Sequence, residues 1–311
     1  MPRRSPLAAL LTAAVLLPAA AACGSGSAAG NAADGPAVVA AFYPLEFVAG
    51  RVGGTAVTVT GLAKPGAEPH DLELNPGQIA QLSDADLVVY LKGFQPAVDG
   101  AVAQAAGAAA LDVAATVPLL DAAAGGHEHE GGDVADNGGG PDPHLWLDPT
   151  RLATVGDALA ARLATADAEA ADGFRSRAAA LRSDLTALDK EYADGLRDCQ
   201  RREMIVSHAA FGYLAERYNL EQIAVTGLSP EQEPSPQRLA AVIEEAREHK
   251  ATTIFFETLV SPEVAETIAQ EVGARTAVLD PLEGLEPGTD DDYLAVMRKN
   301  LATLRTALGC R

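Results

Sequence analysis

The chain has 311 residues, of which 43 are acidic and 23 are basic, and its formal net charge is −20. A protein this acidic repels the phosphates of nucleic acids, so nucleic-acid binding is excluded. Outside the N-terminus, no stretch of the sequence is apolar for long enough to span a membrane. The length fits one large domain or two domains of ordinary size.

The N-terminus has the composition of a secretory signal peptide. Residues 1–4 are basic, Leu7–Leu17 are mostly apolar and small residues follow, so we expect residues 1–22 to be cleaved off. Cys23 comes next and resembles the lipid-bearing cysteine of a bacterial lipoprotein, although Ala20 stands where leucine is usual. The alternative is an ordinary signal peptide followed by an incidental cysteine.

The segment that follows predicts a tether. Residues 23–35 are rich in glycine, alanine and serine, which is typical of a flexible linker. A lipid on Cys23 would anchor the protein to the outer face of the cell membrane. Loss of Arg3 and Arg4 with the signal peptide changes the formal charge from −20 to −22. This acidity attracts cations weakly, and it accounts equally well for solubility.

Short apolar strands alternate with helices in the first half of the chain. This alternation predicts an α/β lobe with a mainly parallel sheet that is covered on both faces. We assign residues 36–166 to this N-terminal lobe. The expected strands are 37–43, 57–62, 86–91 and 110–113, and the expected helices are 45–52, 76–83 and 95–107.

The second half repeats the pattern and predicts a C-terminal β/α lobe at residues 199–311. Its apolar segments again alternate with segments of helical periodicity. The expected strands are 203–207, 221–225, 252–257 and 275–279, and the expected helices are 211–218, 236–249, 262–272 and 291–308.

A long helical region lies between the two lobes. One helix is expected at 149–164 and a second at 168–197, where Leu181, Leu185 and Leu188 recur at helical spacing. At 1.5 Å per residue the second helix is roughly 45 Å long. We therefore expect residues 167–198 to form a rigid backbone helix that joins the lobes and permits only a small closing motion.

Two cysteines remain when Cys23 is set aside. In an exported protein two such cysteines usually pair, so we expect a disulfide between Cys199 and Cys310. Catalytic or metal-binding thiols are the alternative, but neither cysteine lies near a histidine motif.

Three histidines lie just after predicted strands or before predicted helices. His70, His144 and His208 all occupy this position, and the corresponding edge of an open α/β sheet is where ligands bind. Imidazole and carboxylate groups together suit divalent metals. Nearby carboxylates would accept a hydrogen bond from the second ring nitrogen, and the candidates are Asp71, Asp142 and Asp148.

Residues 125–140 form a glycine-rich, acidic segment that contains His127 and His129. Such a segment cannot pack a core, so we expect a solvated loop. It is a candidate metal-attracting loop that collects or senses metal with low affinity. The alternative is a solvated loop with little effect.

Four motifs occur in a fixed order: KPGAEPHDLELNP, PDPHLWLDP, VSHAAFGYL and VLDPLEGL. Together they resemble the metal-specific solute-binding proteins of bacterial ABC importers, the zinc/manganese class. The resemblance implies two β/α lobes on a rigid helix with one metal between them. It places ligands at His70, His144, His208 and Asp280, with Glu68 or a water molecule as the alternative fourth ligand.

The ligand types favour zinc. Three imidazoles and one carboxylate satisfy tetrahedral Zn²⁺, whereas manganese-binding relatives typically have a carboxylate at the position of His208. Copper would also bind a nitrogen-rich site. We further expect Glu257, at a strand end, to support His208, and His249 to lie on a solvated helix face.

We therefore predict a protein without enzymatic activity. It would capture Zn²⁺ outside the cytoplasm as a monomer and deliver it to the membrane permease of an ABC importer. One alternative is a manganese- or iron-binding protein or an adhesin-like lipoprotein of the same fold. Another is a secreted zinc hydrolase, but the sequence has no HExxH motif.

Overall fold

The computed structural model describes residues 35–121 and 140–311. The predicted signal peptide, Cys23, and both His127 and His129 lie outside these residues. In the described part of the chain, no helix is both long and apolar enough to cross a membrane.

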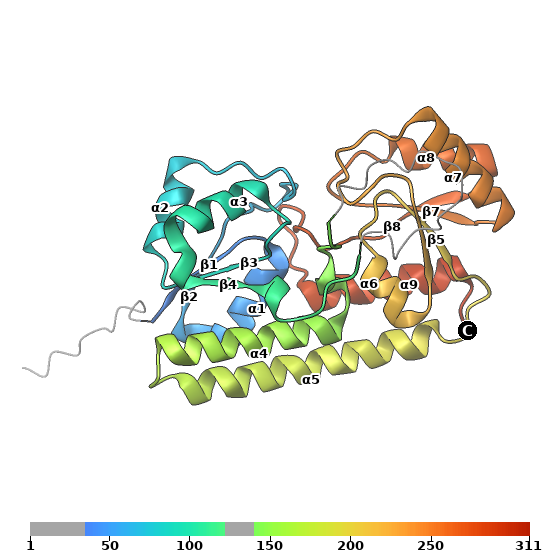
Figure 1. Cartoon of the computed structure of the whole chain (residues 1–311). Coiled ribbons are helices and arrows are strands. Elements are labelled where there is room, and N and C mark those ends of the chain that lie inside the picture. Colours follow the sequence, from blue (N-terminus) through green and yellow to red (C-terminus); the bar gives the residue numbers. More distant parts are fainter. Residues whose placement is uncertain (1–34, 122–139) are drawn as a thin grey trace, which may run out of the picture. The chain divides into compact units, whose positions relative to one another are not determined.

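The N-terminal lobe is built on a four-stranded parallel sheet with the strand order β2-β1-β3-β4 (Figure 1). Three of the four residues in each central strand are buried because helices cover both faces of the sheet, and these strands consist of continuous apolar residues. The strands are β1 Ala37–Ala40, β2 Thr58–Gly61, β3 Leu87–Tyr90 and β4 Ala110–Asp112.

Three helices connect these strands: α1 Tyr43–Gly53, α2 Pro76–Asp84 and α3 Pro96–Ala101. Helix α2 begins at a capping box, in which the side chains of Asn75 and Gln78 accept hydrogen bonds from each other's backbone N–H groups. The helix expected at 95–107 is interrupted, because α3 passes into a π-helical turn at Val102–Ala106. The side chains at 103–105 are exposed and provide little packing to hold a regular helix there.

The C-terminal lobe repeats this topology. Its parallel sheet has the order β6-β5-β7-β8, so the first strand of each lobe occupies the same central place. This agreement confirms the predicted fold class of two parallel-sheet α/β lobes. The elements are β5 Glu203–Val206, α6 Gly212–Tyr218, β6 Glu221–Ala224, α7 Pro236–Glu248, β7 Thr253–Phe256, α8 Glu263–Val272, β8 Arg275–Val278 and α9 Tyr293–Leu308.

Helices α4 (Pro149–Ala166) and α5 (Ala171–Leu196) lie side by side (Figure 1). Helix α5 buries the predicted apolar stripe and is hydrogen-bonded to elements of both lobes. Its Arg177 Nε donates to the carbonyl oxygen of Val52 in α1 at 2.7 Å, and its Tyr192 hydroxyl donates to that of Met297 in α9 at 2.6 Å. One helix therefore holds both lobes.

One continuous apolar core runs through β1, β3, α4, α5, α6 and α9, and a smaller core lies between β5, β7, α7 and α8. Residues of both lobes belong to the same compact unit. Cys199 and Cys310 are joined by a disulfide, which ties the start of the C-terminal lobe to the last helix.

Candidate metal centre

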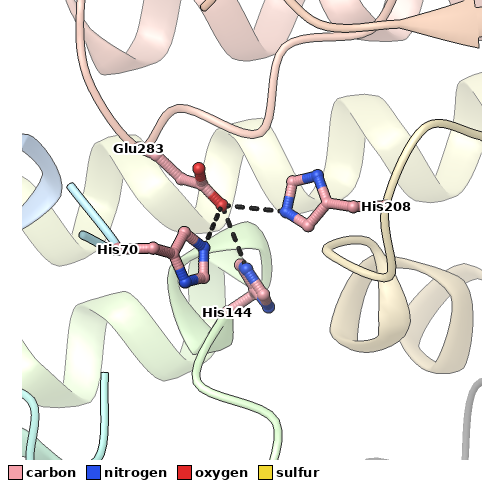
Figure 2. A group of neighbouring side chains, drawn as sticks. All are labelled: His70, His144, His208 and Glu283. Carbon is pink, nitrogen blue, oxygen red and sulfur yellow. Dashed lines mark hydrogen bonds and ion pairs between the residues drawn. The ribbon is translucent and has the colours of Figure 1, made fainter. Parts of the chain in front are cut away.

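Four buried side chains point toward one another: His70, His144, His208 and Glu283 (Figure 2). One potential ligand atom from each lies within 4.8 Å of all the others. The Oε1 atom of Glu283 lies 3.2, 3.0 and 3.1 Å from the Nε2 atoms of His70, His144 and His208, respectively. The structure thus brings together all three histidines that the sequence predicts.

His70 lies in the long turn between β2 and α2. Its backbone N–H donates to Glu68 Oε1 at 2.8 Å, and its ring packs edge-on against Phe94, with the ring centroids 4.6 Å apart. The buried side chain of Gln95 donates to the carbonyl oxygen of Pro69 at 3.1 Å. This turn therefore holds His70 mainly through its backbone and one aromatic contact.

His144 lies directly before the short 3₁₀ turn Leu145–Leu147 that leads into α4. Asp142 Oδ1 accepts the backbone N–H of His144 at 2.9 Å and lies 2.7 Å from Nδ1 of the same ring. Asp142 thus has the orienting role considered in the sequence. Asp148 instead caps α4, with its side chain accepting the N–H of Thr150 at 2.8 Å, and Asp71 is exposed.

His208 follows β5, and a carboxylate orients its ring too. Glu257, at the end of β7, lies with Oε1 2.8 Å from His208 Nδ1 and accepts a hydrogen bond from the Ser207 hydroxyl at 2.6 Å. The predicted support of His208 by Glu257 is confirmed. His249 Nδ1 lies 3.5 Å from Glu203, away from this group.

The expectation of Asp280 as the fourth member is corrected to Glu283. Asp280 Oδ1 accepts the N–H of Leu282 at 2.7 Å and Oδ2 accepts the Thr258 hydroxyl at 3.3 Å, so this carboxylate closes a turn. In that turn Leu282 adopts a φ of 60°, and the next side chain, Glu283, points inward. The carboxylate that lies among the histidines does belong to the motif VLDPLEGL, but it is Glu283, three residues after Asp280.

Contacts around the turn fix its position. Asn300 of α9 binds both backbone groups of Asp280: its Oδ1 accepts the N–H at 3.0 Å and its Nδ2 donates to the carbonyl oxygen at 2.7 Å. Trp146 Nε1 donates to the carbonyl oxygen of Pro281 at 2.7 Å. The segment that carries His144 is therefore bonded to the segment that carries Glu283.

The electrostatics of the group favour a cation. Burial raises the pKa of Glu283, but the charge of His208 and hydrogen bonds from all three imidazoles outweigh burial and hold this pKa well below its ordinary value. Burial and the Glu283 charge raise the pKa of Glu68 to about 8. The Oε2 atoms of Glu68 and Glu283 are buried without a hydrogen-bond partner among the described residues. Acidic oxygens thus outnumber the donors available to them.

The spacing between Glu283 Oε1 and the three imidazole nitrogens is close to that in a small tetrahedral site, and all four potential ligand atoms lie within 4.8 Å of one another. At Zn–N and Zn–O distances of ~2 Å, adjacent ligand atoms of a tetrahedron are about 3.3 Å apart. The separations of 3.0 to 3.2 Å between Glu283 Oε1 and the three Nε2 atoms are close to that spacing. In His144 and His208 the carboxylate at Nδ1 leaves Nε2 directed at the common point.

Comparisons with known proteins agree with this geometry. Residues 38–307 match the family model described as zinc-uptake complex component A, periplasmic. The zinc-binding protein AdcA of Streptococcus pyogenes is 37% identical over 284 residues, which cover 86% of this chain and 55% of AdcA. This chain thus spans about half the length of that relative. The high-affinity zinc uptake system protein ZnuA of Bacillus subtilis is 33% identical over 298 residues, which cover 93% of each chain.

A solved structure is similar as well. The Zn(II)-bound ZnuA-like domain of Streptococcus pneumoniae AdcA matches with a TM-score of 0.73 and 32% sequence identity, covering 88% of this chain and 99% of that one. The resemblance inferred from the four sequence motifs is thereby confirmed. With its two parallel-sheet lobes and its buried histidine–glutamate group, the chain belongs to the family of the periplasmic zinc-uptake complex component A.

Proposed function

We propose that this protein captures one Zn²⁺ ion outside the cytoplasm and delivers it to the membrane permease of an ABC importer. The ligands would be His70, His144, His208 and Glu283. The convergence of three imidazole Nε2 atoms on one buried carboxylate oxygen carries this proposal. The names of its relatives, AdcA as a zinc-binding protein and ZnuA as part of a zinc uptake system, support it.

The ligand set favours zinc over manganese and iron. Zn²⁺ accepts a tetrahedral shell and binds imidazole nitrogen strongly, whereas Mn²⁺ prefers more oxygen donors and a higher coordination number. A hydrolase would need one coordination position free for water, and in the proposed ligand set Glu283 would take the fourth position.

The contacts of α5 support a carrier with a small closing motion. Because α5 is hydrogen-bonded to α1 and to α9, a wide separation of the lobes would break one of these two hydrogen bonds. Release to a permease would then require a local displacement of one or two ligands. We propose that the protein works in this way as a monomer.

We also propose that the mature protein begins at Cys23, carries a lipid there and stays at the outer face of the cell membrane. The small residues before Cys23 and the glycine-rich segment after it support this proposal. Cys23→Ala should release the protein from the membrane fraction while leaving zinc binding unchanged. Retention of the Cys23→Ala variant in the membrane fraction would refute the lipid anchor.

A metal titration tests the proposed cargo. The mature protein is freed of metal and titrated with Zn²⁺, Mn²⁺ and Fe²⁺ against a chromophoric chelator. We expect one zinc ion per chain, bound far more tightly than manganese or iron. Tighter binding of manganese or iron would reject the assignment. Tight binding of copper would leave it standing, because copper binds most nitrogen-rich sites more strongly than zinc.

A further inference from the structure

Tyr213 connects the segment that carries His208 to Asp142, the residue that orients the ring of His144. It is the second residue of α6, five residues after His208, and its side chain is fully buried. Its hydroxyl donates to the carbonyl oxygen of Asp142 at 2.7 Å and accepts the backbone N–H of Leu120 at 2.9 Å. The same segment that carries His208 therefore grips the residue that orients His144.

Asp142 is held on every side by this arrangement. Its backbone N–H donates to the carbonyl oxygen of Leu120 at 2.8 Å, and its carboxylate meets the backbone and ring of His144. A Cβ atom at Gly212 would lie only 2.6 Å from Asp142 Oδ2, so the carboxylate rests directly against the glycine that precedes Tyr213. Gly212 contacts the carboxylate of Asp142, and Tyr213 is hydrogen-bonded to its backbone carbonyl oxygen.

The tyrosine ring itself is held in place from the side of α4. The guanidinium group of Arg151 lies 4.7 Å from the ring centroid of Tyr213 and donates to Glu216 at 3.1 Å. Burial raises the pKa of Tyr213, so its hydroxyl keeps its proton and remains a donor at neutral pH. The hydroxyl thus has one stable orientation, toward Asp142.

We propose that Tyr213 is a positioning residue of the zinc site, which fixes His144 relative to His208 by holding Asp142. This inference rests on the proposed zinc-binding function. Without the hydroxyl, the carbonyl oxygen of Asp142 and the N–H of Leu120 lose their shared partner, and Asp142 is less firmly positioned. Zinc then leaves faster, and the preference for a tetrahedral ion weakens. A tyrosine that merely fills the core would affect stability alone.

Tyr213→Phe tests the proposal against a matched control on the same helix. Tyr218 also has a buried ring, but its hydroxyl donates to Asp189 of α5 at 3.1 Å and not to the segment that carries Asp142 and His144. We expect Tyr213→Phe to raise the zinc Kd by about threefold to tenfold, mainly through a faster dissociation into excess chelator. Tyr218→Phe should leave Kd and dissociation rate unchanged. Equal zinc kinetics in the two variants would overturn the proposal.

A spectroscopic readout separates positioning from stability. Co²⁺ replaces Zn²⁺ in such sites, and its visible absorption reports the geometry of the ligand shell. Tyr213→Phe should weaken and shift the tetrahedral Co²⁺ bands, while Tyr218→Phe should reproduce the wild-type spectrum. An unchanged spectrum in Tyr213→Phe would contradict the proposed role, whatever happens to the melting temperature.

A double-mutant cycle tests the route through Asp142. In an Asp142→Ala background, adding Tyr213→Phe should change the zinc Kd by less than about twofold, because the carboxylate that links residue 142 to the ring of His144 is gone. Independent, multiplicative effects would reject this route. If Tyr213→Phe does not fold, Gly212→Ala takes its place in the test. The added methyl group would displace the Asp142 carboxylate and should also weaken zinc binding. A wild-type Kd in Gly212→Ala would refute the proposed positioning of Asp142.

The wild-type protein keeps the two proposals apart. If the wild-type protein does not bind zinc, the proposed function is refuted, and with it the role of Tyr213 that rests on that function. If it binds zinc and Tyr213→Phe behaves like Tyr218→Phe, only the role of Tyr213 falls.

Discussion

The three imidazoles of the site are held in two different ways. His144 and His208 have no exposed surface, and each has a carboxylate within 2.8 Å of Nδ1. His70 is 9% exposed, and its Nε2 atom is the farthest of the three from Glu283, at 3.2 Å. Within residues 35–121 and 140–311, the only carboxylate paired with the His70 ring is Glu283, and it lies at Nε2 rather than at Nδ1. The group therefore combines two firmly held imidazoles with one less restrained imidazole. If the protein binds zinc as proposed, we expect His70 to release the ion first.

Removal of single histidines should have the largest effect. We expect His144→Ala and His208→Ala to weaken zinc binding by about a hundredfold to a thousandfold, because each loses a ligand and leaves a buried carboxylate without its partner. His70→Ala should cost about tenfold less than either. Competition titrations measure all three constants. An equal or larger loss in His70→Ala would break the distinction between the two firmly held imidazoles and the less restrained one.

Acidification should act mainly through the two firmly held imidazoles. Burial alone would lower the pKa of His144 and His208, but the carboxylates of Asp142, Glu257 and Glu283 raise both above the ordinary value of 6.5. Burial lowers the pKa of His70. A raised pKa means that a ring keeps its proton to higher pH, and zinc must displace the proton from Nε2.

Zinc affinity should therefore fall as the pH falls through the neutral range, by up to about tenfold per pH unit for each ring that binds a proton. Calorimetric zinc titrations in buffers of different ionisation enthalpy measure how many protons are released when zinc binds. Affinity that stays flat from neutral pH to about pH 5 would contradict a site made of histidines.

Substitution of Glu283, the proposed fourth ligand, should have the next largest effect on zinc binding. Glu283→Gln should weaken zinc binding by about tenfold to a hundredfold, because the charged oxygen at the common point is lost. Asp280→Asn keeps the size of the turn residue and should change zinc Kd by less than about threefold. The reverse order of the two variants would restore Asp280 as the ligand.

Substitution of the carboxylates near the histidines should weaken zinc binding less, but again more at His144 and His208 than at His70. Glu257→Gln and Asp142→Asn should each raise the zinc Kd by about tenfold, because Nδ1 of the firmly held rings loses a charged acceptor. Glu68→Gln changes a group that accepts only the backbone N–H of His70 through Oε1 and should have less effect. A larger loss in Glu68→Gln than in Glu257→Gln would show that the less restrained imidazole depends on its neighbour more than the firmly held ones do.

The smallest effect is expected from residues 125–139, which lie outside the described part of the structure. Deleting these residues removes His127 and His129 but none of the four proposed ligands, so the zinc Kd should stay within about twofold. The rate of zinc capture at limiting metal should fall if this segment collects zinc. An unchanged capture rate would leave the segment without a role in metal collection.

Much of this arrangement could be predicted because it depends on local signals. Strands β1 and β3 are continuous apolar runs, and His144 and His208 stand where chain segments leave a strand or enter a helix. Glu283 was missed because its direction depends on a tertiary environment. A non-glycine residue, Leu282, adopts a positive φ only because Asp280 and Asn300 shape the turn around it.

The grip of Tyr213 on Asp142 was likewise invisible in the sequence. The two residues are 71 positions apart, and the tyrosine has the apolar neighbours of any core residue. Only the packing of α6 against the segment before α4 brings the hydroxyl to the carbonyl oxygen. Contacts of this kind follow from the whole fold, whereas helix starts and strand ends follow from a few adjacent residues.

A crystal structure of the zinc-loaded mature protein, with the metal located by its anomalous scattering, tests the central claim most directly. We expect one zinc ion with four ligands at about 2.0–2.2 Å, namely the Nε2 atoms of His70, His144 and His208 and a carboxylate oxygen of Glu283. Zinc bound by Asp280 in place of Glu283, or bound without one of the three histidines, would contradict the account.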